Sequence, residues 1–426
     1  MTETSLSSPL SPSRERSMLL LLALAQFAVI FDVISVMPLA PQLMSAFGAG
    51  PSALSGLIAA YSWCACASGL IAAAYADRFD RKTLLLSMFV LFFLGNIACA
   101  LSASFPALMA ARALCGFSGG VVSGVVMAIV GDAIPASRRG AAISVALTAS
   151  SLASIFGVPL AVGMASRFGW ESHFLLLAGL SLAVCLGAWK IVPSMASHIG
   201  PKTTLRATLS QLGAVFANPR HRQAFALSMG SSISIMLLAP FIAPVLAGNL
   251  GFSSADIGWA YFFGGCSALI TSRFVGRWCD RSGSLQAYSK LSLLFIAPAL
   301  FLTHLPQLSL AAMACFFTLL TSTMSGRSIS LQSTLSSVSS AQSRGSFLSA
   351  NLALQQLASG AGAWLGSLTL SMDSSGRIEG YGANGWAASA ICIWTAWWVF
   401  KLRPSAHHGE ASDCAPIRQA PSKADV

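Results

Sequence analysis

The chain has 426 residues, of which 55% are hydrophobic and only 9% are charged, and it carries a formal net charge of +11 at pH 7. Soluble domains are about 25% charged, so a water-soluble protein is excluded and a polytopic membrane protein is predicted. The basic residues alternate with apolar spans and form no patch, which argues against a nucleic-acid partner.

Twelve apolar segments follow one another along the chain, each of about 20 residues, a length that crosses the hydrocarbon of a bilayer as an α-helix. The first carries Asp32 and leads into further spans, so it is not predicted to be a cleavable signal peptide. We therefore predict an all-α polytopic membrane protein with twelve transmembrane helices. The expected spans are residues 18–44, 54–75, 83–102, 106–131, 140–164, 173–192, 223–247, 255–276, 286–303, 307–330, 345–371 and 384–401.

The lysines and arginines between the spans predict the orientation, because cytoplasmic loops are enriched in both. With the N-terminus placed in the cytoplasm, only Arg167 and Arg377 of the 25 basic residues fall on the opposite side, and Arg112 and Arg327 lie within spans. Both termini are therefore expected to be cytoplasmic. The predicted location is a plasma membrane, crossed many times, and in a bacterium this is the inner membrane.

The chain contains an internal repeat, in which APQLMSAFGAG at residues 40–50 resembles APVLAGNLGFS at residues 243–253. Pro41 pairs with Pro244 and Gly48 with Gly251, each pair 203 residues apart. Two like halves around a central site are typical of transporters. The predicted organisation is a six-helix bundle at residues 1–192, a cytoplasmic linker at 193–222, a second six-helix bundle at 223–404 and a disordered cytoplasmic tail at 405–426.

Charged residues gather in one short loop, AAYADRFDRK at residues 73–82. This run resembles the G-x-L-A-D-R-x-G-R-K signature of the major facilitator superfamily, with Ala73 and Asp80 in place of the two glycines. A second copy at residues 276–283 keeps both glycines. The resemblance covers the chain from the first span to the last, and it implies the fold of that superfamily, two pseudo-symmetric bundles of six helices.

The resemblance also implies a cytoplasmic gate, in which Asp77 meets the start of span eleven near Arg344 and Arg81 bridges to Asp132 at the end of span four. Such contacts, each worth about 1 kcal/mol, would hold the halves together on the cytoplasmic side and favour an outward-open state. The simpler interpretation is a topology signal, which explains Arg81 but not Asp77. The expected gate residues are Asp77, Arg78, Arg81, Asp132, Asp280, Arg281 and Arg344.

Further stretches resemble parts of the same superfamily. LMAARALCGFSGG at residues 108–120 resembles its fourth-span pattern, and FAVIFDVISVMPLAPQLM at 27–44 resembles the first span of its arabinose-efflux and drug-efflux branch. SLASIFGVPLAVGM at 151–164 resembles a Gly-Pro motif associated with antiporters, through Gly157, Pro159 and Gly163. The alternative is a proline kink with small residues that allow close helix packing.

Opposite charges lie within the predicted spans, where a charge costs about 2.5–3.5 kcal/mol on insertion scales. Asp32 and Arg112 each share a helical face with small residues, so both are expected to point into the bundle interior. They are predicted to couple proton movement to transport, and the alternative is a purely structural pair. Arg327, near the inner end of span ten, is interpreted as extending toward the membrane interface.

These features predict a proton-coupled antiporter that exports a small molecule, such as a drug, sugar or metabolite, by alternating access. The alternative is a proton symporter that imports a sugar or an organic acid. An enzyme is disfavoured, because the sequence has no HExxH and no paired acids within its spans.

The predicted partners are a small-molecule substrate, protons and the lipid bilayer, and the protein is expected to be a monomer. No cofactor is expected, because the proton gradient supplies the energy. No metal site is expected, because most cysteines lie inside apolar runs. The candidate substrate-cavity residues are Phe27, Phe31, Tyr61, Asn351, Gln355 and Gln356.

Overall fold

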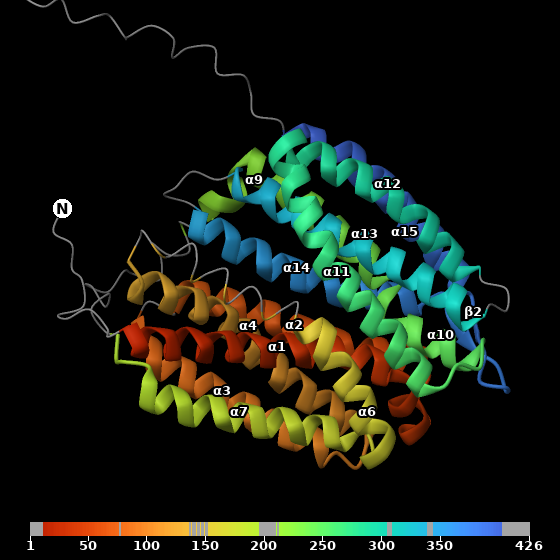
Figure 1. Ribbon diagram of the computed structural model, residues 1–426, viewed down its shortest axis with the longest axis horizontal. Helices are drawn as coiled ribbons and strands as arrows, with labels where there is room; N and C mark the ends of the chain where they lie inside the picture. The colour runs from red at the N-terminus through yellow and green to blue at the C-terminus, as the bar shows by residue number, and fades with distance from the viewer. Residues whose placement is uncertain are drawn as a thin grey trace, which may run out of the picture.

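The computed structural model describes residues 12–402 except 76–77, 136–137, 139–141, 143–144, 146–148, 150–151, 196–209, 211–212, 305–308 and 339–343. The described chain is almost entirely helical, as predicted (Figure 1). Seven of its helices are long and apolar enough to cross a membrane by length and composition. Large apolar side chains cover their outward faces, for example Leu20, Leu186 and Trp189, each more than half exposed, as expected for surfaces that contact lipid.

Each predicted span other than the fifth overlaps one described helix or one run of helices. The first part of the chain forms α1 (Pro12–Phe47), α2 (Pro51–Tyr75), α3 (Arg81–Ala100), α4 (Phe105–Ala133), the π-helix η2 (Ala153–Gly157), α6 (Val158–Phe168) and α7 (Glu171–Ile191). The fifth span, predicted at 140–164, is described only in part and appears as η2 and α6 from Ala153 onward.

The second part of the chain repeats this order of helices. It forms α9 (Pro219–Met236), the 3₁₀-helix η3 (Ala239–Phe241), α10 (Ile242–Gly248), α11 (Ser254–Ser282), α12 (Ser284–Thr303), α13 (Leu310–Ser336), α14 (Arg344–Ser367), β1 (Ser371–Met372), β2 (Ile378–Glu379), α15 (Tyr381–Trp398) and η4 (Val399–Leu402). The predicted tail at 405–426 lies outside the described residues.

Two local features depart from the predicted continuous helices. The seventh span is broken after Met236, because Pro240 has no N–H to donate and its ring clashes with the carbonyl four residues earlier. A short antiparallel hairpin of β1 and β2, which the sequence analysis does not predict, joins α14 to α15. Asn249, after α10, fixes this hairpin by donating to the Ile378 carbonyl at 2.8 Å and accepting from the Ile378 N–H at 2.7 Å.

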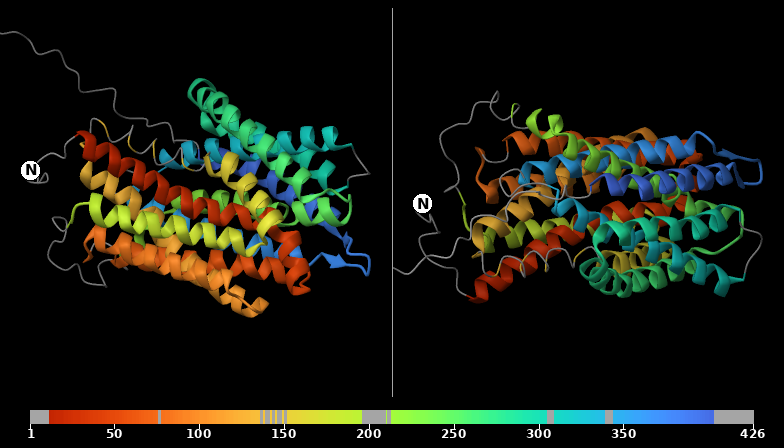
Figure 2. Two further views of the ribbon diagram at one scale, coloured as in Figure 1. Left: turned by 60° about the horizontal axis from the view of Figure 1, so that its bottom comes forward. Right: turned by 90° about the horizontal axis from the view of Figure 1, so that it is seen from above.

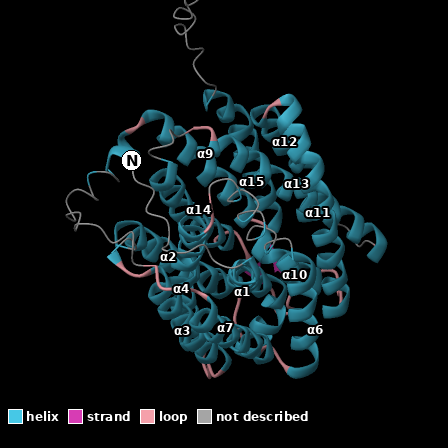
Figure 3. Cartoon of the chain, turned by 60° about the vertical axis from the view of Figure 1, so that its left-hand side comes forward, coloured by secondary structure: helices cyan, strands magenta, loops and turns pink. Residues whose placement is uncertain are grey.

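The helices gather into two groups, α1 to α7 and α9 to α15, which pack against each other chiefly along three pairs of α-helices (Figures 1 and 2). These pairs are α2 with α14, α6 with α11, and α1 with α10. Figure 3 shows α1 near the middle of the bundle, with α3 and α7 at its outer edge. The largest core cluster is built from residues of the first group alone, so that group has its own buried interior.

The sequence repeat has a structural counterpart at the helix ends. Gly48 after α1 and Gly251 after α10 both adopt left-handed backbone, with φ of +59° and +71°, a conformation that glycine adopts without a steric penalty. Ser104 and Ser309 each accept a hydrogen bond from the third residue of α4 and of α13, so the same N-cap begins both helices.

The two ends of the bundle differ. One end, which we call the basic end, carries Arg81, Lys82, Arg138 and Arg220 at helix termini. At the opposite end the two groups are in close contact, since Met44 and Leu54 share one buried cluster with residues of η3 and α10.

Glycines set the distance between α2 and α4. A Cβ at Gly116 would overlap the backbone of Tyr61, and one at Gly120 would overlap the backbone of Ala65. Close approach of two helices at small residues is a common way to pack helices in a membrane. This approach places Tyr61 directly against α4.

Replacement of Gly116 is therefore expected to separate α2 from α4. We predict that Gly116→Ala lowers the free energy of unfolding in detergent by about 1–3 kcal/mol, the usual cost of overpacking. Gly131→Ala, where nothing lies within 4 Å of the new methyl group, is the matched control and is expected to be neutral or slightly stabilising. Equal thermal stability of the two variants would contradict this account of the packing.

Candidate functional site

A buried ion pair lies inside the first group of helices. The Nη1 atom of Arg112 on α4 donates to Oδ1 of Asp32 on α1 at 2.5 Å. Asp32 is 0% exposed and Arg112 is 2% exposed. A charge in these surroundings is tolerated only with a partner, so each residue explains the presence of the other.

Tyr61 of α2 covers this pair. The guanidinium carbon of Arg112 lies 4.5 Å from the centre of the Tyr61 ring, within the range of a cation–π interaction. Oδ2 of Asp32, Nε of Arg112 and the Tyr61 hydroxyl have no hydrogen-bond partner among the described residues. The pair therefore retains hydrogen-bonding capacity that this conformation does not use.

Aromatic and polar side chains surround the pair on its other side. Ser35, one turn after Asp32, lies 2.7 Å from Nε2 of His173 on α7. The Phe31 ring meets the His173 ring edge to face at 5.0 Å, and Phe31 also packs against Gly157, where a Cβ would lie 2.5 Å from the ring. The last residue of the π-helix thus makes room for Phe31 beside the ion pair.

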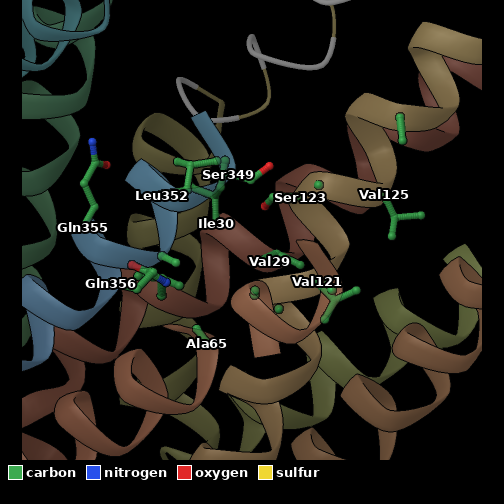
Figure 4. A pocket seen from close by; sticks show the side chains of 18 of the residues that line it. Val29, Ile30, Ala65, Val121, Ser123, Val125, Ser349, Leu352, Gln355 and Gln356 are labelled. Carbon is green, nitrogen blue, oxygen red and sulfur yellow. The ribbon is translucent and has the colours of Figure 1, made fainter. Parts of the chain in front are cut away.

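A cavity of about 600 Å³ runs between the two groups from the middle of the bundle to the basic end (Figure 4). Its wall includes Val29 and Ile30 of α1, Ser123 of α4, and Gln355 and Gln356 of α14. Arg81 and Gly345 line it at the basic end. Apart from Arg81, the lining carries amide, hydroxyl and apolar groups, which suit an uncharged ligand.

The predicted cavity residues are placed in two ways. Tyr61, Gln355 and Gln356 line the cavity, whereas Phe27, Phe31 and Asn351 are not part of its lining. Asp32 and Arg112 do not line it either, and Tyr61, which touches both the cavity and Arg112, connects them to it. Helical periodicity identifies a buried face but cannot distinguish a side chain on a cavity wall from one packed behind it.

The structure describes most, but not all, of the predicted gate residues. Arg81 Nε donates to Asp132 Oδ2 at 3.2 Å, so the structure brings together the two residues expected to meet. Arg78 lies over the Tyr75 ring at 4.9 Å. Asp280 and Arg281 are exposed at the end of α11. Asp77 and the side chain of Arg344 lie outside the described residues.

Asp80, which replaces a glycine of the signature, makes contacts of its own. Its Oδ1 accepts a hydrogen bond from the backbone N–H of Met195 at 2.6 Å, and its Oδ2 accepts one from Thr83 at 3.2 Å. Partial burial raises the pKa of the Asp80 carboxyl, but the hydrogen bonds from Met195 and Thr83 outweigh it and lower this pKa below its usual 3.8. Asp80 therefore ties the turn before α3 to the segment after α7.

The three residues of the Gly-Pro stretch differ in their surroundings. Pro159 lies in the first turn of α6, directly after the π-helix η2. Gly157 accommodates Phe31, whereas Gly163 has nothing within 4 Å of the position of a Cβ. Only Gly157 has a packing requirement that its neighbours explain.

The interpretation of Arg327 is wrong. Its side chain does not reach the interface but is 0% exposed inside the second group of helices. It donates to Ser292 Oγ at 3.1 Å and to Ser234 Oγ at 3.0 Å, and it lies 4.8 Å from the centre of the Phe295 ring. Serine hydroxyls and an aromatic face supply acceptors within the bundle, so the long side chain has no need to extend to water.

Sequence reasoning also missed His173. The residue begins the sixth predicted span, and the only signal was an imidazole inside an otherwise apolar segment.

Within the described residues, no group of three His, Cys, Asp or Glu side chains could hold a metal ion.

Comparison with known proteins supplies independent information. Residues 22–363 match the model of the Major Facilitator Superfamily. The chain is 26% identical over 212 residues to the uncharacterized MFS-type transporter YtbD of Bacillus subtilis, covering 50% of this chain and 52% of that protein. It is 25% identical over 292 residues to the "Probable sugar efflux transporter" of Helicobacter pylori, covering 66% and 69%. The chain thus spans about half to two thirds of the length of these relatives.

Solved structures share the fold. A bacterial homolog of the human lysosomal transporter Spinster, in an inward-facing and occupied conformation, has a TM-score of 0.74 at 15% identity, covering 92% of this chain and 97% of that one. A D-xylose-proton symporter has a TM-score of 0.73 at 18% identity, covering 92% and 98%. The predicted arrangement of twelve helices in two bundles agrees with these structures.

Removal of one partner of the buried pair is expected to destabilise the protein. Arg112→Met leaves the Asp32 carboxylate without its counter-charge, and we predict a loss of about 3–5 kcal/mol in the free energy of unfolding. The double variant Asp32→Leu/Arg112→Met removes both charges and is expected to recover most of that loss. The measurement is thermal unfolding in detergent, and a single variant as stable as the wild type would show that the pair is not needed for folding.

Loss of the Asp80 side chain is expected to release the segment after α7. We predict that Asp80→Ala speeds hydrogen–deuterium exchange of the Met195 amide at neutral pH, because that amide loses its acceptor. Since the pKa of Asp80 is lowered, the charged form holds the contact above pH 3.8, and the contact weakens only as the pH falls through the lower folded pKa. Asp256→Ala, at the capping box of α11, is the control. Unchanged exchange at Met195 in Asp80→Ala would refute the link.

Proposed function

Because the chain belongs to the major facilitator superfamily, we propose that it is a proton-coupled antiporter that exports an uncharged small molecule by alternating access. It is a multi-pass membrane transporter and not an enzyme, and transporters of this superfamily carry small molecules without a cofactor. The proton coupling, the direction and the substrate form the proposal.

The observation that carries the proposal is the Asp32–Arg112 pair. Asp32 is the only carboxylate among the described residues that lies far from both ends of its helix. Protonation of Asp32 removes the charge that holds Arg112, because a neutral carboxyl no longer attracts a guanidinium. Arg112 lies under the Tyr61 ring, and Tyr61 lines the cavity. A change in protonation is therefore transmitted to the cavity wall through one side chain.

The cavity supports an uncharged, hydroxylated substrate such as a sugar. Gln356, Ser123 and Ser349 offer both donors and acceptors, while Val29 and Ile30 offer an apolar face. A relative in Helicobacter pylori is named a "Probable sugar efflux transporter", which agrees with this chemistry. Drugs and other metabolites with similar polarity are the competing substrates in this class.

Import by proton symport is the second candidate. It is favoured by the fold shared with a D-xylose-proton symporter, and Asp32 could serve either direction. The Gly-Pro stretch favours antiport instead, since Gly157 places Phe31 and the π-helix directly beside the ion pair.

The proposal includes an orientation. We place the basic end in the cytoplasm by the distribution of lysine and arginine, with both termini there and the protein monomeric in a bacterial inner membrane. The bundles at 1–192 and 223–404, joined by the linker at 193–222, then rock about the central cavity. In this orientation the cavity, lined at the basic end by Arg81, is directed toward the cytoplasm. The Arg81–Asp132 contact, present here between α3 and α4 of the first bundle, holds Arg81 at the end where the proposed gate between the bundles closes.

The test is uphill transport by Asp32 variants. In everted vesicles with an imposed pH gradient, a panel of neutral sugars, charged sugars and drugs identifies the substrate. We predict that Asp32→Asn abolishes pH-driven accumulation and keeps substrate exchange, because asparagine retains the shape and an acceptor for Arg112. Asp32→Glu is expected to retain partial coupling with a shifted pH profile.

The matched control is Glu379→Gln, an exposed acid in the hairpin, which is expected to transport normally. If Asp32→Asn accumulates substrate against a gradient with an unchanged proton dependence, Asp32 is structural and the proposed coupling is rejected. Accumulation that follows the opposite pH gradient would favour symport.

A further inference from the structure

His173 is a buried imidazole on the side of the ion pair away from the cavity. It lies in the first turn of α7, and its backbone N–H contacts the Trp170 carbonyl in the turn after α6. Its side chain is 0% exposed. The turn at Gly169 and Trp170 is at the end of the bundle opposite the basic end, so His173 lies between that end and Asp32.

The hydrogen bonds around Ser35 determine which ring nitrogen of His173 carries the proton. The Ser35 hydroxyl donates to the Phe31 carbonyl at 2.6 Å. Its oxygen is then free to accept, so at 2.7 Å it accepts from Nε2–H of His173. In the neutral ring this leaves a lone pair on Nδ1, and Nδ1 has no hydrogen-bond partner in the described part of the chain.

The serine connects this imidazole to the coupling site. Ser35 follows Asp32 by three residues on α1, so the two side chains lie on the same face of that helix. Oδ2 of Asp32 has no partner among the described residues and is the available proton acceptor. The imidazole, the hydroxyl and the carboxylate thus lie in succession along one side of the bundle, and because Oδ2 makes no hydrogen bond to Ser35 in this conformation, the last step needs a bridging water.

We propose that His173 and Ser35 form a relay that delivers the proton from the outer side to Asp32. When the end opposite the basic end opens, Nδ1 of His173 takes a proton from water. The Nε2 proton moves to the Ser35 oxygen, and the hydroxyl proton of Ser35 turns from the Phe31 carbonyl and passes through a bridging water to Oδ2 of Asp32. One proton enters, one is delivered, and His173 returns to a neutral ring with the proton on the other nitrogen until ring reorientation or exchange restores the starting tautomer.

The charges around His173 favour passing the proton on. The groups facing it are Asp32 on α1 and, behind it, Arg112 on α4, and an imidazolium near Arg112 is repelled by a like charge. The other titratable groups on α7 and on the elements packed against it are Arg167 on α6, Cys99, Arg81 and Lys82 on α3, Arg14, Glu15 and Arg16 at the start of α1, and Glu171, Cys185 and Lys190 on α7. Asp32 is the only acid among these groups that lies beside the relay.

This inference rests on the proposed proton coupling, and the test separates the two. In proteoliposomes of the full chain, substrate exchange without a gradient and pH-driven transport are measured as the outer pH varies over about 5 to 8, the range in which histidine titrates. His173→Phe keeps an aromatic ring against Phe31, and Ser35→Ala removes only the hydroxyl. The control is His221→Gln, a change at a buried histidine on α9 whose ring is tilted against that of Phe347, with the ring centres 4.7 Å apart.

We expect His173→Phe and Ser35→Ala to keep exchange and to slow pH-driven transport by about a hundredfold, the lower range for loss of a positioned acid–base group. The remaining rate should lose its dependence on outer pH and its slowing in D₂O, which a change in packing alone would not alter. His221→Gln should match the wild type. If His173→Phe fails to fold, the same transport measurements are made on His173→Gln, which also removes the imidazole.

Normal driven transport with unchanged outer-pH dependence in both His173→Gln and Ser35→Ala would overturn the relay. If Asp32→Asn is uncoupled in the same preparation, the proposed antiport stands without the relay. If Asp32→Asn still transports uphill, the proposed coupling and the relay both fail.

Discussion

The interaction on which the site depends is the attraction between one carboxylate and one guanidinium in a region with almost no water. Neither Asp32 nor Arg112 could remain charged there alone, because the desolvation cost exceeds what one hydrogen bond returns. Their contact fixes α1 against α4, and the glycines of α4 bring α2 close enough for Tyr61 to cover the pair. The same attraction is weakened by a single proton, which makes a structural contact suitable as a switch.

The second group of helices handles a buried charge differently. Arg327 has serine hydroxyls and aromatic faces around it, and no acid pairs with it in the described chain. Its surroundings do not change with protonation of a carboxylate. The two halves repeat the same helix order and the same caps, yet among the described residues only the first half carries a buried acid–base pair, so the repeat provides the framework and the departure from it provides the chemistry.

Much of the fold follows from the sequence, because span length, basic loops and the repeat at 203 residues are properties of whole segments. The superfamily resemblance drawn from residues 73–82 is confirmed. The sequence analysis did not predict the 3₁₀ break at Pro240 or the hairpin before α15, since both depend on local backbone geometry. In the site, the burial of Asp32 and Arg112 was predictable from their small neighbours, whereas the burial of Arg327 and the contact of His173 with Ser35 depend on which helices meet, and one sequence does not contain that information.

The hairpin between α14 and α15 has a mechanical consequence. The side-chain amide of Asn249 donates to the backbone carbonyl of Ile378 and accepts from its backbone N–H. These two hydrogen bonds join the turn after α10 to the hairpin, so the two form one corner of the second bundle. Separation at that end must then occur between this corner and the loop at Gly48 on the first bundle. An antibody fragment that bridges the corner and the loop would act as a clamp and hold the transporter in one conformation, and it would also supply a fiducial mass for imaging.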